Sequence, residues 1–95
     1  MLEGTPYAAE IAGVPIGLYR RGAELLAIGD ICPHQGDVYL SDGYLEGETI
    51  ECPMHQSCFS LRDGAVLAPP AEEGVASYAV RVEDGAVFVE LEGER

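Results

Sequence analysis

Two short pairs of metal-binding residues constrain this chain more than any other feature. The first pair is Cys32 and His34, the second is Cys52 and His55, and seventeen residues separate the two pairs. Each pair offers one thiolate and one imidazole. Thiolates select soft or borderline metals, and imidazole suits zinc, iron, copper and nickel. A mixed set of four ligands therefore indicates zinc or an iron–sulfur centre, and disfavours calcium and magnesium.

The mixed composition of each pair favours iron over zinc. Structural zinc sites commonly place two cysteines in one turn and two histidines on another. A Rieske [2Fe–2S] centre instead holds one iron with two cysteines and the other iron with two histidines. Two similar loops can then each supply one ligand of each kind. On spacing alone, structural zinc is the main alternative.

Further motifs surround the two pairs. They are Cys32-Pro33-His34-Gln35-Gly36, Cys52-Pro53-Met54-His55-Gln56-Ser57-Cys58-Phe59, Arg62-Asp63-Gly64 and Pro69-Pro70-Ala71. From about Tyr7 to its C-terminus the chain resembles the Rieske ferredoxins that serve bacterial ring-hydroxylating dioxygenases. The resemblance implies that Cys32 and Cys52 bind one iron, and that His34 and His55 bind the other through Nδ1. It also implies a third loop, around the two prolines, that shields the cluster.

Short strands separated by turns make up the rest of the chain. The clearest are Val75 to Glu83 and Ala86 to Glu92, whose apolar residues alternate and which Asp84-Gly85 joins as a hairpin. Shorter strands are expected at 7–12, 16–20, 24–29, 44–46, 49–51, 59–61 and 65–67, and no helix of ten or more residues is expected. We predict one all-β domain over residues 1–95, an antiparallel sandwich or barrel. The resemblance implies a Rieske-type fold with a cluster-binding subdomain inserted at about 32–67. It also implies one further strand before Tyr7, so we expect a shortened N-terminus.

The charge balance excludes some partners. Seventeen Asp and Glu face five Arg and no Lys, for a formal net charge of −12. Like-charge repulsion disfavours nucleic acid and anionic membranes. The acidity fits either solubility or attraction to basic docking sites on redox partners. No apolar run approaches the roughly 20 residues that span a bilayer, and no secretory pattern begins the chain. We expect a cytoplasmic monomer.

Four positions bear on the reduction potential. High-potential Rieske proteins join their ligand loops by a disulfide at the positions of Asp37 and Met54, which cannot form it. Ser57 and Phe59 stand where those proteins carry a Ser and a Tyr whose hydroxyls bond to sulfur. Losing the Tyr hydroxyl lowers the potential, toward the lower part of the range of roughly −150 to +300 mV. The alternative interpretations are a Ser57 hydroxyl bonded to nearby backbone and core packing for Phe59.

The resemblance implies a carrier and not an enzyme. Such a protein passes single electrons from a flavin-dependent reductase to a terminal ring-hydroxylating dioxygenase in aromatic hydrocarbon catabolism. One alternative is the ferredoxin of a diiron monooxygenase system. Another, of a different class, is a structural zinc-binding interaction module, which would be colourless. A small regulatory subunit related to nitrite reductase would not need all four ligands. Cys58 stands outside the ligand set, so no intramolecular disulfide is expected.

Overall fold

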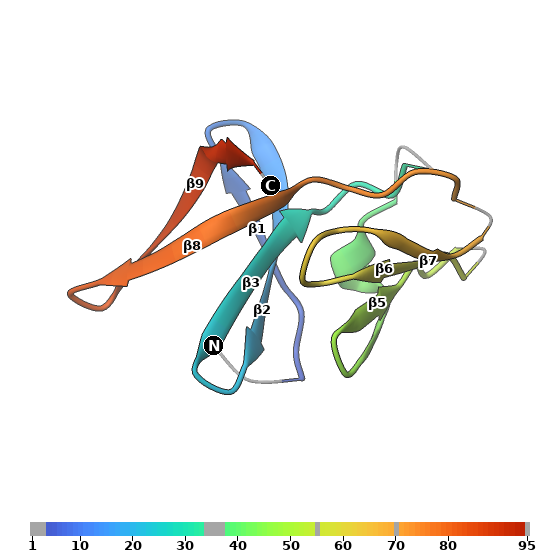
Figure 1. Ribbon diagram of the computed structural model, residues 1–95, viewed down its shortest axis with the longest axis horizontal. Helices are drawn as coiled ribbons and strands as arrows, with labels where there is room; N and C mark the ends of the chain where they lie inside the picture. The colour runs from blue at the N-terminus through green and yellow to red at the C-terminus, as the bar shows by residue number, and fades with distance from the viewer. Residues whose placement is uncertain (1–3, 34–37, 55, 70, 95) are drawn as a thin grey trace.

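The computed structural model describes residues 4–33, 38–54, 56–69 and 71–94. These residues form two antiparallel β-sheets and one short 3₁₀ turn, which confirms the predicted all-β class (Figure 1). Within these ranges no helix is long and apolar enough to cross a membrane.

The larger sheet is the scaffold, and its strands follow the order β1-β2-β3-β8-β9. Their bounds are β1 (Tyr7–Ile11), β2 (Val14–Arg21), β3 (Glu24–Gly29), β8 (Ser77–Glu83) and β9 (Ala86–Glu94). The predicted β8–β9 hairpin is confirmed. Asp84 and Gly85 both adopt positive φ, 51° and 80°, as a two-residue turn of type I′ requires. The sequence placed the start of the first of these strands too early. Val75 N donates to Gly64 O instead, so β8 starts at Ser77.

The smaller sheet lies between β3 and β8 in the sequence, and its order is β4-β5-β6-β7. Its strands are β4 (Tyr44–Glu46), β5 (Thr49–Glu51), β6 (Cys58–Ser60) and β7 (Val66–Ala68), preceded by the 3₁₀ turn η1 (Leu40–Asp42). The predicted hairpin at Gly47-Glu48 joins β4 and β5, and Gly47 has a φ of 58°. β6 and β7 are each offset by one residue from the predicted ranges. The end of β5 and the start of β6 open toward the second ligand pair.

The two sheets share one core. Tyr19 and Ile28 of the scaffold pack with residues of the smaller sheet and its loops, namely Cys32, Leu40, Ile50, Cys52, Phe59, Leu61 and Ala71. A second cluster of Ile16, Leu18 and Ala27 lies on the other face of β2 and β3. Successive side chains on a strand point to opposite faces, so β2 is covered on both. Both cysteines of the predicted site therefore belong to the hydrophobic core.

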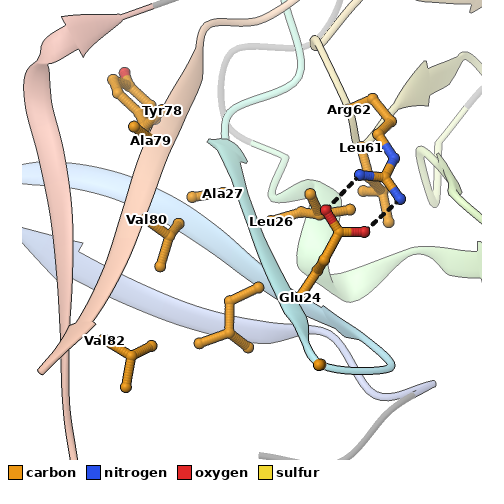
Figure 2. Close-up of a pocket in the computed structure, with 11 residues that line it drawn as sticks. Glu24, Leu26, Ala27, Leu61, Arg62, Tyr78, Ala79, Val80 and Val82 are labelled. Atoms are coloured by element: carbon orange, nitrogen blue, oxygen red, sulfur yellow. Dashed lines mark hydrogen bonds and ion pairs between the residues drawn. The ribbon is translucent and has the colours of Figure 1, made fainter. Parts of the chain in front are cut away.

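Arg62 ties the two sheets together at the surface. Its Nη1 and Nη2 donate to Glu24 Oε2 and Oε1 at 2.8 and 2.7 Å, as Figure 2 shows. Its Nε and Nη2 donate to the two oxygens of Glu48 at 3.1 and 2.7 Å. Glu24 begins β3, whereas Glu48 and Arg62 stand in two turns of the smaller sheet. The hydrogen bonds and charge of Arg62 lower the pKa of both carboxyls below their ordinary value of 4.5.

These lowered pKa values predict a pH-dependent contribution to stability. Because the folded protein holds fewer protons on Glu24 and Glu48 than the unfolded chain, the contribution is complete above pH 4.5. It is lost as the pH falls below that value. We expect Arg62→Gln to lower the Tm at pH 7, and the difference from wild type to shrink in acid. Thermal melts at several pH values measure both.

Arg81→Gln is the matched control for this prediction. Arg81 pairs with Glu83 and Glu90 inside the β8–β9 hairpin and does not join the two sheets. Its replacement should lower the Tm less than that of Arg62. A Tm difference for Arg62→Gln that stayed constant through the acid range would contradict the role given to the two glutamates.

Candidate metal centre

Cys32 and Cys52 are brought together from separate parts of the chain. Cys32 follows β3 and Cys52 follows β5, and both are fully buried. The pKa of the Cys52 thiol is raised to about 11, chiefly by burial and further by the hydrogen bond and charge of the neighbouring Cys32. A hydrogen bond from the Met54 backbone opposes this rise. Two buried thiols in contact suit a soft cation, because a bound metal favours the thiolate form that burial disfavours. The donor set of the described residues thus fits one iron of a [2Fe–2S] cluster.

Each cysteine stands at the foot of a closed loop. Cys32 N donates to Val38 O at 3.0 Å, and Cys52 N donates to Ser57 O at 2.7 Å. Gln56 adopts a φ of 64°, in the left-handed region that residues other than glycine rarely use, so the second loop turns sharply. Both predicted ligand cysteines thus donate their backbone N–H to the residue that closes their loop.

His34 and His55 fall inside these two loops and lie outside the described residues, as do Asp37 and Pro70. Within the described ranges no group of three or more His, Cys, Asp or Glu side chains could hold a metal ion. The assignment of four ligands is a prediction. Of these four residues, the structure describes Cys32 and Cys52.

Ser57 connects the second ligand loop to the third loop. Its side chain is fully buried, and Oγ accepts a hydrogen bond from Ala71 N at 2.9 Å. Ala71 packs in the same core as both cysteines. Ser57 is therefore bonded to backbone, as the alternative interpretation proposed. Accepting this bond leaves the hydroxyl hydrogen to be donated elsewhere.

The other singled-out side chains divide between core and surface. Phe59 is fully buried in the core that contains both cysteines, so its packing role is confirmed. Met54 is 47% exposed beside the second cysteine. Cys58 is half-buried, and its thiol donates to Gln56 O at 3.6 Å.

Sequence reasoning missed Asp30, a buried carboxylate two residues before Cys32. It accepts hydrogen bonds from Ser41 N at 2.8 Å and from Ser41 Oγ at 2.6 Å. Burial raises its pKa, and the bonds from Ser41 oppose that rise. In the sequence, Gly29-Asp30-Ile31 leads the chain into the first predicted ligand loop. The one available signal was an acidic residue next to an otherwise apolar strand and metal ligand.

A pocket of about 390 Å³ lies apart from this centre. It is the space between β3 and β8 that Figure 2 shows, with Arg62 and Glu24 beside it and mostly aliphatic side chains along it. Neither Cys32 nor Cys52 lines it.

The Ser57 bond predicts a measurable loss of stability. Ser57→Ala leaves the buried Ala71 N–H without its acceptor, which should cost about 1–3 kcal/mol of unfolding free energy. Urea unfolding curves measure the loss. Ser60→Ala is the control, because Ser60 Oγ accepts an exposed hydrogen bond from Arg62 N. An equal loss of unfolding free energy in the two variants would show that the buried bond stabilises the fold no more than the exposed one.

Known proteins place this fold and centre in a family. A model of the Rieske [2Fe-2S] domain matches residues 1–79. The chain is 36% identical over 91 residues to the ferredoxin component of a naphthalene 1,2-dioxygenase system from Pseudomonas putida, covering 96% of this chain and 86% of that protein. It is 44% identical over 85 residues to the anthranilate 1,2-dioxygenase ferredoxin subunit of Burkholderia cepacia, covering 88% of this chain and 78% of that protein.

A solved structure agrees with the sequence relatives. A chain in the complex of reduced oxygenase and oxidized ferredoxin of carbazole 1,9a-dioxygenase superposes with a TM-score of 0.85. The sequences are 33% identical, and the match covers 94% of this chain and 82% of that chain. The present chain therefore belongs to the Rieske [2Fe-2S] domain family. Within that family it is a ferredoxin, an electron carrier that binds a Rieske-type cluster and is not itself the oxygenase. Ligand spacing alone left both an iron–sulfur centre and structural zinc open. Membership of this family decides for the iron–sulfur cluster.

Proposed function

We propose that this ferredoxin passes single electrons from a flavin-dependent reductase to a terminal ring-hydroxylating dioxygenase. In this proposal Cys32 and Cys52 bind one iron, and His34 and His55 bind the other. The observation that carries it is the contact between two buried cysteine side chains, each at the foot of a loop that contains one of the two histidines. The domain is a single unit over residues 1–95, with the segment at about 32–67 inserted as the cluster-binding part.

When bound, the cluster accepts and releases one electron. The chain's own residues hold it and separate it from water. Both cysteines are fully buried, so the route to a partner leads through the surface of the ligand loops. Two side chains are exposed on this surface: Pro33, directly after Cys32, and Met54, directly before His55. An acceptor that covers this surface would bring its own redox centre close without any change in the core.

We also propose a monomer located in the cytoplasm. No disulfide joins Cys32, Cys52 and Cys58, all three of which the structure describes, and this suits a reducing compartment. A net charge of −12 opposes self-association. Size-exclusion chromatography with light scattering tests the monomer, and a mass near twice 10.1 kDa would contradict it.

Transfer assays with purified partners test the function directly. The reduced ferredoxin is mixed with a ring-hydroxylating oxygenase, and separately with a diiron monooxygenase, and its reoxidation is followed by stopped-flow absorbance. We expect fast transfer to the ring-hydroxylating enzyme. Faster transfer to the diiron enzyme would overturn the proposed acceptor. A rate that falls with added salt would show attraction between the acidic carrier and a basic docking site.

Ligand variants test the four-residue assignment. The purified protein should be red-brown, with the visible absorbance of a Rieske cluster. Cys32→Ala, His34→Ala, Cys52→Ala and His55→Ala should each abolish this absorbance, because each removes one of the four bonds to iron. Cys58→Ala is the matched control and should retain it. Loss of colour in Cys58→Ala, or its retention in His55→Ala, would refute the assignment.

Phe59→Tyr tests how the core sets the reduction potential. Phe59 is packed with both cysteines, so a hydroxyl added to its ring enters the environment of the cysteine sulfurs. A hydrogen bond to sulfur stabilises the reduced cluster, and the potential should rise. Phe88→Tyr, on the exposed ring in β9, should leave the potential unchanged. Redox titration measures both, and a wild-type value above about +150 mV would contradict the argument.

A further inference from the structure

The carboxylate of Asp30 is buried at the base of the first ligand loop. Asp30 is 1% exposed, and its two side-chain oxygens accept hydrogen bonds from the backbone and the hydroxyl of one residue, Ser41, at 2.8 and 2.6 Å. Hydrogen bonds to a carboxylate are shorter and stronger than those between neutral groups. The donor is a neutral serine, so the carboxylate is buried without gaining an opposite charge from this partner.

The bonds between Asp30 and Ser41 complete a short ladder between the two legs of the loop. Cys32 N donates to Val38 O, Ile31 forms an isolated bridge with Tyr39, and Leu40 N donates to Asp30 O. The side chain of Asp30 then reaches one residue further along the second leg. The ladder thus fixes the position of Cys32 relative to η1.

The scaffold strand β2 reserves space for this carboxylate. Gly17 is buried in the middle of β2, where a Cβ would lie 2.9 Å from Asp30 Oδ1 and 3.0 Å from the Tyr19 hydroxyl oxygen. Asp30 N also donates to Pro15 O at 3.1 Å. Glycine weakens a strand interior, so its presence here is explained by the close approach of these polar groups. Asp30 therefore joins three elements: β2, the first ligand loop and η1.

We propose that Asp30 is a positioning residue for the electron-transfer centre and acts through Ser41 to hold the first ligand loop, with Cys32, in its binding geometry. The proposal rests on the proposed role of Cys32 as a ligand. A burial that costs free energy is retained because it orients a ligand, as partners of metal ligands commonly do. Replacing such partners typically weakens metal binding 10–100-fold.

A nearly isosteric pair of variants at Ser41 tests the proposal in the cluster-loaded protein. Ser41→Thr keeps the hydroxyl, and Ser41→Val replaces it with a methyl group of similar size. We expect Ser41→Val to lose the visible absorbance about tenfold faster than wild type in the presence of an iron chelator. Its reduced form should also show shifted EPR g-values, which report the geometry of the ligands. Ser41→Thr should restore both toward wild type.

Two further variants complete the experiment. Asp30→Asn should behave like Ser41→Val, because the amide keeps the shape but not the charged acceptor. Asp42→Asn removes the neighbouring exposed charge on η1 without touching either bond, and should match wild type. Equal rates and g-values for Ser41→Thr and Ser41→Val would overturn the positioning role. If Cys32→Ala keeps its cluster, the ligand assignment itself fails, so the two failures are distinguishable.

Discussion

The contact between two buried cysteines is the constraint on which the rest of this structure depends. Cys32 and Cys52 come from loops on different strands, and their side chains meet inside a core that both sheets contribute to. Burial raises the pKa of the Cys52 thiol, so the protein alone favours the protonated form of that side chain. The arrangement becomes favourable with a soft metal, whose binding free energy then adds to folding. The hydrophobic core thus contains both cysteines that we propose as ligands of the cluster.

Several hydrogen-bonded side chains connect the scaffold sheet and the smaller sheet to the loops that carry the two cysteines. At the surface, Arg62 connects β3 to two turns of the smaller sheet. In the interior, Ser57 holds the third loop against the second ligand loop. At the first ligand loop, Asp30 connects β2 to η1. Each of these side chains joins elements from different parts of the chain. A carrier that must keep its ligands in place in both oxidation states benefits from such restraint, since little then rearranges when the electron moves.

Local signals in the sequence predicted many of the strands and turns. The long-range contacts between them could not be predicted from such signals. Alternating apolar residues and Asp84-Gly85 were sufficient for the β8–β9 hairpin, because strand period and turn chemistry act over a few residues. Val75 carried the same pattern, yet its N–H bonds to Gly64, a tertiary contact that periodicity does not contain. The pairing of Cys32 with Cys52 followed from a motif. The burial of Asp30 could not be predicted, because its partner Ser41 lies eleven residues further along the chain, which is outside the range of local sequence patterns.

The sparse pairing between β3 and β8 bears on how the protein matures. Within the part of the chain that the structure describes, the register of these strands pairs Ala27 with Tyr78 and Ile28 with Ser77, and Gly29 N donates to Ala76 O just beyond. The chain between them includes the entire smaller sheet. The β1–β2–β3 meander and the β8–β9 hairpin close over short loops, whereas joining them closes a much longer one at a higher entropic cost. A smaller sheet that is already ordered brings the ends of that long loop closer together. A cluster that linked the two ligand loops would shorten this long loop, and would thereby lower the entropic cost of joining β3 to β8.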